Sequence, residues 1–175
     1  DYAFADCLEL KSITIPNSIT KIGAHAFDGC AVLNNVRIPA SVNTLGDYAF
    51  ANCTSITSIE IPNRVTSIGS YAFRNCSSLI SINIPDNVTS IGNYAFYNCT
   101  SLQFNVYDDC NYLGNSSNPY IALISYKTNK SAYNIDSNCK FICSTAFYNC
   151  TSLTSMALPD SVTSIGEFAF AHCFS

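Results

Sequence analysis

The sequence predicts an α/β repeat solenoid that is mostly β, with about seven short strands in a parallel sheet and short helical or 3₁₀ turns between them. The first observation is a cysteine every 23 residues, at Cys7, Cys30, Cys53, Cys76 and Cys99, and again at Cys150 and Cys173. The second is a phenylalanine three residues before each of these cysteines. The third is a pair of further columns, glycine and proline, that keep the same 23-residue step.

Each repeat contains a segment that alternates like a short strand. In the unit that begins at Cys53, Ile59 and Ile61 flank Glu60, so the two isoleucines point inward and the carboxylate points outward. Pro62 follows at once, and proline ends a strand because it has no N–H to donate to the ladder.

The rest of the unit turns back to close the coil. Val65 and Ile68 make a second apolar step, Gly69 permits a tight turn, and residues 71–73 form one helical or 3₁₀ turn that buries Phe73. A lone coil has no second layer to cover its apolar face, so successive coils must stack at about 4.8 Å, the spacing of strands in a sheet.

The repeat breaks between Cys99 and Cys150. Phe104 and Val106 match the inward pair of the preceding unit in a coil of 22 residues, and the next coil has 29. Its residues 114–119, Gly-Asn-Ser-Ser-Asn-Pro, are a strong turn signal between two apolar runs. A β-hairpin near residues 110–130 follows from this pattern, and it carries Tyr112, Tyr120 and Tyr126.

The domain organisation is one solenoid over residues 1–175. Regular repeats occupy residues 1–103, irregular coils with the hairpin insertion occupy 104–134, and regular repeats resume over 135–175. Both termini fall in the middle of a repeat unit, so we expect the chain to be a fragment of a longer array.

Composition excludes several classes of function. The net charge is −4, and the 8 basic residues are scattered, so we predict no nucleic-acid partner. No run of eighteen apolar residues exists, so we predict no membrane span. No nucleotide-binding or catalytic motif appears, and two histidines offer little to a metal, so we predict neither an enzyme nor a cofactor or metal site.

The ten cysteines invite a disulfide or metal interpretation. We favour small buried side chains for the seven in the regular column, because parallel thiols about 4.8 Å apart cannot form a tetrahedral cage. Cys110 and Cys139 fall in the valine column of consecutive coils, so a disulfide between them is possible, although parallel side chains make its dihedral angle awkward. Cys143, in the glycine column, is a candidate exposed thiol.

The repeat from Cys76 to Phe96 reads C-x-x-L-x-x-I-x-I-P-x-x-V-x-x-I-G-x-x-A-F, and it resembles the BspA-like leucine-rich-repeat family over nearly the whole chain. The resemblance implies a right-handed solenoid in a cell-surface or secreted protein. It also implies an adhesion or protein-binding role rather than catalysis.

Differences between the repeats concentrate at outward strand positions, which in solenoids form extended binding faces. Our first hypothesis is a non-catalytic interaction or adhesion module, a monomer that binds a protein or glycan through this face. The candidate face residues are Lys11, Thr14, Arg37, Glu60, Asn83 and Asn134. An ion pair between Arg37 and Glu60 is expected from their neighbouring strands.

Two alternatives stay open. The three hairpin tyrosines form either a second binding surface or, as we favour, a spacer whose rings pack on their own strands. The whole chain is alternatively a structural stalk that displays another domain and has no ligand of its own, because serine, threonine and asparagine dominate the face.

Overall fold

The computed structural model describes residues 1–174, which fall into two compact units. The first unit is Asp1–Gln103, and the second begins at Phe104. Each unit is a mostly β arrangement of stacked coils and is described by itself.

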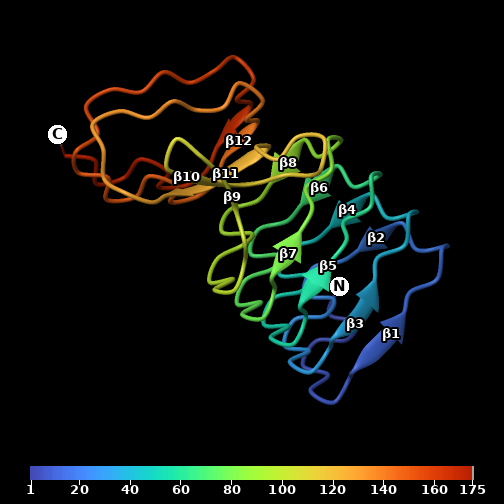
Figure 1. Ribbon diagram of the computed structural model, residues 1–175. Helices are drawn as coiled ribbons and strands as arrows, with labels where there is room; N and C mark the ends of the chain where they lie inside the picture. The colour runs from blue at the N-terminus through green and yellow to red at the C-terminus, as the bar shows by residue number, and fades with distance from the viewer. Residues whose placement is uncertain (175) are drawn as a thin grey trace. The chain divides into compact units, whose positions relative to one another are not determined.

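The first unit is a parallel solenoid, as predicted, with two rows of short strands on two sides of its coils (Figure 1). One row contains β1 (Ser12–Thr14), β3 (Asn35–Arg37), β5 (Ser58–Ile59) and β7 (Ser81–Ile82). The other contains β2 (Lys21–Ile22), β4 (Thr44–Leu45), β6 (Ser67–Ile68) and β8 (Ser90–Ile91). Every pair is parallel and in register at the repeat length, for example Ser12 with Asn35 and Thr44 with Ser67.

The row of strands that the sequence predicts is not the row that forms a continuous sheet. The predicted row is split into two separate pairs, β1 with β3 and β5 with β7, whereas β2, β4, β6 and β8 form one continuous four-stranded sheet. The sequence suggested only an apolar step for the second row, because its two-residue strands are too short to show alternation.

The predicted helical turns are wrong: residues 1–174 contain no α-helix or 3₁₀-helix. The chain there makes consecutive β-turns, and φ is positive at Tyr48 (55°) and Asn52 (59°). The N–H groups of Tyr48, Phe50 and Asn52 donate to carbonyls of the next coil, at 2.9, 2.8 and 2.7 Å. These N–H groups therefore serve the stack of coils and are not free to form a helix.

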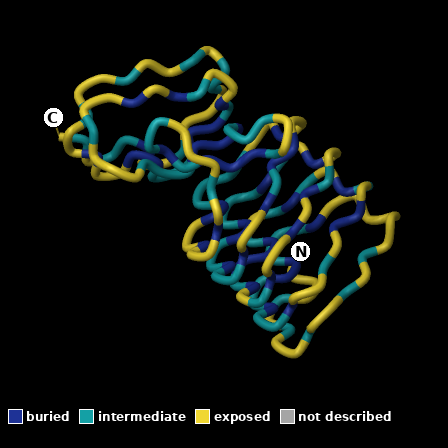
Figure 2. The backbone as a smooth tube through the Cα atoms, viewed as in Figure 1, coloured by how far each residue is buried: buried dark blue, intermediate teal, exposed yellow. Residues whose placement is uncertain are grey.

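The interior is built from columns of like side chains at the 23-residue step. Figure 2 shows the buried positions, in dark blue, recurring from coil to coil. Phe27, Phe50 and Phe73 stack with ring centroids 5.2 and 5.6 Å apart. Four column cysteines of the first unit donate the S–H to the carbonyl of the phenylalanine 26 residues earlier, as Cys76 does to Phe50 at 3.1 Å; the four are Cys30, Cys53, Cys76 and Cys99. A Cβ on Gly69 would lie 2.4 Å from the carbonyl carbon of Gly46, so the glycine column is required by the close approach of neighbouring coils.

The second unit contains the predicted hairpin. Its strands are β9 (Asn105–Tyr107), β10 (Cys110–Leu113), β11 (Ala122–Tyr126), β12 (Phe141–Ile142) and β13 (Ser164–Ile165). The hairpin is formed by β10 and β11, which are antiparallel, and β11 then pairs with β12 and β12 with β13 in parallel.

A second reversal, between β9 and β10, was not predicted. Asp108 and Asp109 both have positive φ, 41° and 66°, which is the conformation of a two-residue type I′ turn. The turn brings β10 back antiparallel to β9, so Val106 is 48% exposed instead of pointing inward. Two consecutive aspartates between short apolar runs are the signal that marks this turn in the sequence.

Candidate functional site

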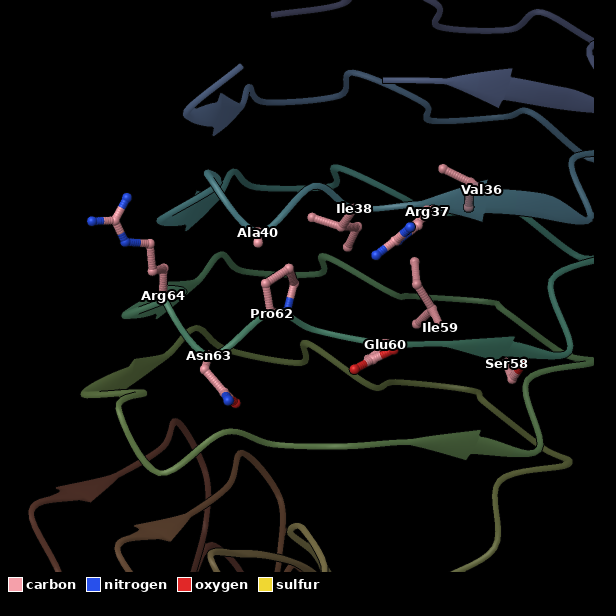
Figure 3. A pocket seen from close by; sticks show the side chains of 10 residues that line it. All are labelled: Val36, Arg37, Ile38, Ala40, Ser58, Ile59, Glu60, Pro62, Asn63 and Arg64. Carbon is pink, nitrogen blue, oxygen red and sulfur yellow. The ribbon is translucent and has the colours of Figure 1, made fainter. Parts of the chain in front are cut away.

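An open groove of about 520 Å³ lies between the second coil (residues 30–52) and the third (53–75), on the side of β3 and β5 (Figure 3). Its apolar lining includes Val36, Ile38, Ile59 and Pro62. Its polar lining includes Arg37, Glu60, Asn63 and Arg64. The four polar residues are exposed.

The groove lies where the backbone ladder between two coils is interrupted. Just before the strand, Asn34 donates its N–H to Lys11 at 3.1 Å, and Ile80 donates to Thr57 at 2.8 Å. The equivalent bond from Thr57 to Asn34 is not formed, and β3 and β5 do not pair. The two coils are therefore separated along this row of strands.

The separation is confined to one side of the coils. On the other side, Thr44 and Leu45 pair in register with Ser67 and Ile68. The next interface on the groove side is also closed, because the side chain of Asn83 accepts from Ile61 N–H at 2.8 Å and donates to Ile61 C=O at 3.0 Å. The second and third coils thus open like a wedge toward the face of β3 and β5.

The charged side chains of the groove have no partner among residues 1–174. The expected ion pair between Arg37 and Glu60 is absent, because no contact within 4.0 Å joins them. Arg64 makes no ion pair either. The missing ladder explains this, since strands that are not held in register do not bring side chains of the same column together.

The other candidate face residues have different surroundings. Lys11 and Thr14 are exposed beside and on β1. The Asn83 amide is occupied by the backbone of Ile61, so it closes two coils together. Asn134 belongs to the second unit, where its N–H donates to Asp108 at 2.5 Å.

The hairpin tyrosines are turned largely toward the core of the second unit. Tyr112 is fully buried, so it offers no surface to a ligand. Tyr126 stacks on Phe147 at 6.1 Å, in the position that phenylalanine occupies in regular coils, and its hydroxyl donates to Asn149 C=O at 3.2 Å. Tyr120 is half-buried and packs edge-on against Tyr112.

A network of charges holds the segment after the hairpin. Lys130 lies 3.1 Å from the carboxylate of Asp108 and 3.7 Å from that of Asp109. The N–H of Asn134 and the ammonium of Lys130 lower the pKa of Asp108 below its usual value. Asp109 also accepts a hydrogen bond from the hydroxyl of Thr128. These aspartates therefore anchor residues 127–134 to the turn between β9 and β10.

Cys110 and Cys139 are both fully buried in one apolar cluster of the second unit, where they are free thiols. The structure has no bond between the two thiols, and the disulfide stays a prediction. Burial raises the pKa of Cys110 to about 12 and that of Cys139 to about 11. Cys143 is half-buried as a residue, yet burial of its thiol raises its pKa to about 12, which makes it a poor nucleophile.

Residues 1–174 contain no group of histidine, cysteine, aspartate and glutamate side chains arranged to hold a metal ion, and no helix long and apolar enough to cross a membrane.

Arg64 was missed by the sequence reasoning. The residue two positions after the repeat proline is Ser18, Ser41, Arg64, Asn87 or Ser161, so Arg64 is the one basic residue in that column. This contrast with serine and asparagine in the other coils is the signal that marks Arg64 in the sequence.

Comparisons with known proteins identify the repeat. A family model described as BspA type leucine rich repeat region matches residues 1–121 and 124–175 in six copies. A leucine-rich repeat protein from Bacteroides ovatus superposes with a TM-score of 0.65 at 29% identity, covering 98% of this chain and 43% of that one. The leucine rich repeat protein of T. pallidum also gives 0.65, at 27% identity, covering 99% and 68%.

A leucine-rich repeat protein from Eubacterium ventriosum gives a TM-score of 0.51 at 25% identity, covering 92% of this chain and 51% of that one. This chain thus spans less than half of the Bacteroides protein and about half of the Eubacterium protein. No curated protein sequence matches the chain significantly.

Proposed function

Because this chain belongs to the BspA-type leucine-rich-repeat family, which makes it a protein-interaction or structural module, we propose that it binds a protein or glycan partner without catalysis. The binding surface is the groove between β3 and β5 and the side chains around it. We propose that the protein acts as a monomer. A cell-surface or secreted setting is what the family resemblance implies.

The observation that carries this proposal is the wedge between the second and third coils. A regular ladder would bury the facing backbone groups and pair Arg37 with Glu60, as it joins the same two coils at β4 and β6. Instead, an open groove of about 520 Å³ places the half-buried Val36 and Pro62 beside charges that have no ion pair among residues 1–174. Concave surfaces of this size that combine an apolar lining with a few polar groups are typical of ligand sites.

The chemistry of the groove supports binding rather than a reaction. Glu60 is the one carboxylate of the lining, and no histidine, cysteine or lysine lies beside it to serve as its acid–base partner. The lining therefore lacks the paired groups of a hydrolase.

The test is a binding screen of the 175-residue chain against extracellular-matrix proteins and immobilised glycans, followed by Arg37→Ala and Glu60→Ala. We expect both variants to lose at least tenfold in affinity for the partner that is found, with an unchanged melting temperature. Lys21→Ala, an exposed position in the other row of strands, is the matched control and keeps its affinity.

The competing function is a structural spacer, and the small polar composition of the remaining face favours it. If the chain is a spacer, the screen should find no partner, or all three variants should bind the partner with the same affinity as the parent chain. Either result would remove the groove from the function.

A further inference from the structure

We infer that the groove between β3 and β5 recognises a carboxylated sugar, such as a uronic-acid or sialic-acid residue of a glycan chain. This rests on the proposed function and specifies the ligand class of the same site. Its three components are cationic groups for a carboxylate, polar groups for hydroxyls, and an apolar floor for the carbon face of a sugar ring.

The cationic component is the pair Arg37 and Arg64. The chain has a net charge of −4 and only three arginines, and two of them line this one groove without an ion-pair partner in residues 1–174. A planar guanidinium binds a carboxylate through two parallel hydrogen bonds, so an anionic group is the natural complement of unpaired arginines. Arg37 extends over the groove from β3, while Arg64 lies at its far end (Figure 3).

The hydroxyl-binding component is Glu60 with Asn63. Glu60 is a carboxylate of the same lining with no ion pair among residues 1–174, and when ionised it can only accept hydrogen bonds. Vicinal sugar hydroxyls donate such bonds, and the Asn63 amide both donates and accepts. A ligand that carries a carboxylate and several hydroxyls therefore offers a complement to each kind of polar side chain in the lining.

The floor completes the match. Val36 and Pro62, which are half-buried, provide an aliphatic surface in the lining, whereas Ile59 is only 5% exposed and adds little to it. No aromatic residue lines it, so a ligand contacts this floor through aliphatic groups alone. An acidic peptide would bring several carboxylates close to Glu60, which repel it, and would offer it only backbone N–H groups as donors. The observations favour an acidic glycan over an acidic peptide.

The experiment titrates the full chain with trigalacturonic acid and with 3′-sialyllactose, which separate uronic from sialic carboxylates. The trimethyl ester of trigalacturonic acid and lactose are the uncharged controls, and a hexaglutamate peptide is the control for charge alone. We expect at least one acidic sugar to bind tenfold or more tightly than its uncharged counterpart and than the peptide. Arg37→Gln should lower that affinity tenfold, whereas Arg74→Gln, at the arginine outside the groove, should leave it unchanged.

The outcomes separate this inference from the function beneath it. Failure of both acidic sugars to bind, equal binding of charged and uncharged sugars, or preference for the peptide overturns the sugar-acid assignment. The groove keeps its proposed role if the Arg37→Ala variant no longer binds another partner found in the screen. If changes at Arg37 or Glu60 alter the affinity for no partner, the proposed function fails as well.

Discussion

At the scale of single residues, the asparagine that precedes four of the seven column cysteines performs two tasks at the turn. Asn52, Asn75 and Asn98 all have φ of 59°, a left-handed conformation that asparagine tolerates better than most residues. Their amides form a ladder in which Asn98 donates to Asn75 at 3.0 Å, Asn75 to Asn52 at 2.8 Å, and Asn52 to Asp28 at 2.8 Å. Gly29 stands in the same column with φ of 77°, so the conformation is the stricter requirement.

The two tasks can be separated by replacing Asn75. Asn75→Gly removes the amide ladder but keeps the left-handed turn, whereas Asn75→Ala removes the ladder and strains the backbone. We expect both variants to be less stable, with alanine worse than glycine by about 1 kcal/mol. Urea unfolding of the two variants beside the parent chain measures this difference, and an alanine variant as stable as the glycine variant would refute the account.

The buried thiols make stability depend on pH in the alkaline range. Burial raises the pKa of Cys99 and Cys139 to about 11 from an ordinary value of 9.0. The folded chain therefore holds protons that the unfolded chain releases above pH 9. The free energy of unfolding should be at its full value below pH 9 and fall as pH rises toward 11, by about 1.4 kcal/mol per pH unit for each such thiol.

Tyrosines and lysines also titrate in this alkaline range. A variant that lacks one thiol separates the contribution of that thiol to the pH dependence from theirs. Cys99→Ala should reduce the slope of unfolding free energy between pH 9 and 11 by about 1.4 kcal/mol per pH unit. Chemical unfolding at a series of pH values gives both slopes. Identical slopes would mean that the Cys99 thiol ionises as freely in the folded chain as in the unfolded one.

Residue patterns in the sequence predicted which columns of side chains are buried, but not which residues each side chain contacts. The phenylalanines and cysteines of the inner coils are buried as expected, because a 23-residue step places equivalent residues in register, whereas Phe4 in the first coil is 37% exposed. The absent pairing of Arg37 with Glu60 was not predictable in this way. The pairing depends on the distance between two coils. The 23-residue repeat is the same whether the interface between those coils is closed or open, so the sequence does not show that distance.

At the scale of strands, the central feature is that β3 and β5 do not pair although β4 and β6 of the same coils do. Thr57 N–H, which has no acceptor in the preceding coil, should exchange its hydrogen with solvent faster than its column neighbours. Asn34 N–H and Ile80 N–H, bonded at 3.1 and 2.8 Å, are the internal references. Native-state hydrogen exchange by NMR measures all three, and equal protection of Thr57 and Ile80 would show that the wedge is closed in solution.

The elements divide into those with a local signal and those without one. The hairpin of β10 and β11 was predictable because residues 114–119 are strong turn formers between apolar runs. The row of β2, β4, β6 and β8 was not, because two-residue strands have no alternation to detect. The predicted helical turns failed for a physical reason: hydrogen bonding between coils competes for the same N–H groups, and the sequence pattern of one coil does not show that competition.

At the scale of the whole molecule, the two units differ in what their irregularities do. In the second unit, the departures from the repeat are used internally: Tyr112 fills the core, Tyr126 continues the phenylalanine column, and Asp108 binds Lys130. In the first unit the sequence repeat is regular, yet one interface between coils is open and its charges are unpaired. We therefore place ligand binding in the first unit, and not in the hairpin that the sequence singles out.

The most direct measurement of this claim is chemical-shift mapping on ¹⁵N-labelled protein with a partner from the binding screen or an acidic sugar. The two sides of the same coils provide the comparison within one spectrum. We predict that the largest shifts fall on residues 36–38 and 58–64, with little change at Thr44–Leu45 and Ser67–Ile68. Shifts concentrated on β4 and β6, or on the hairpin of the second unit, would contradict the assignment of the groove as the binding site.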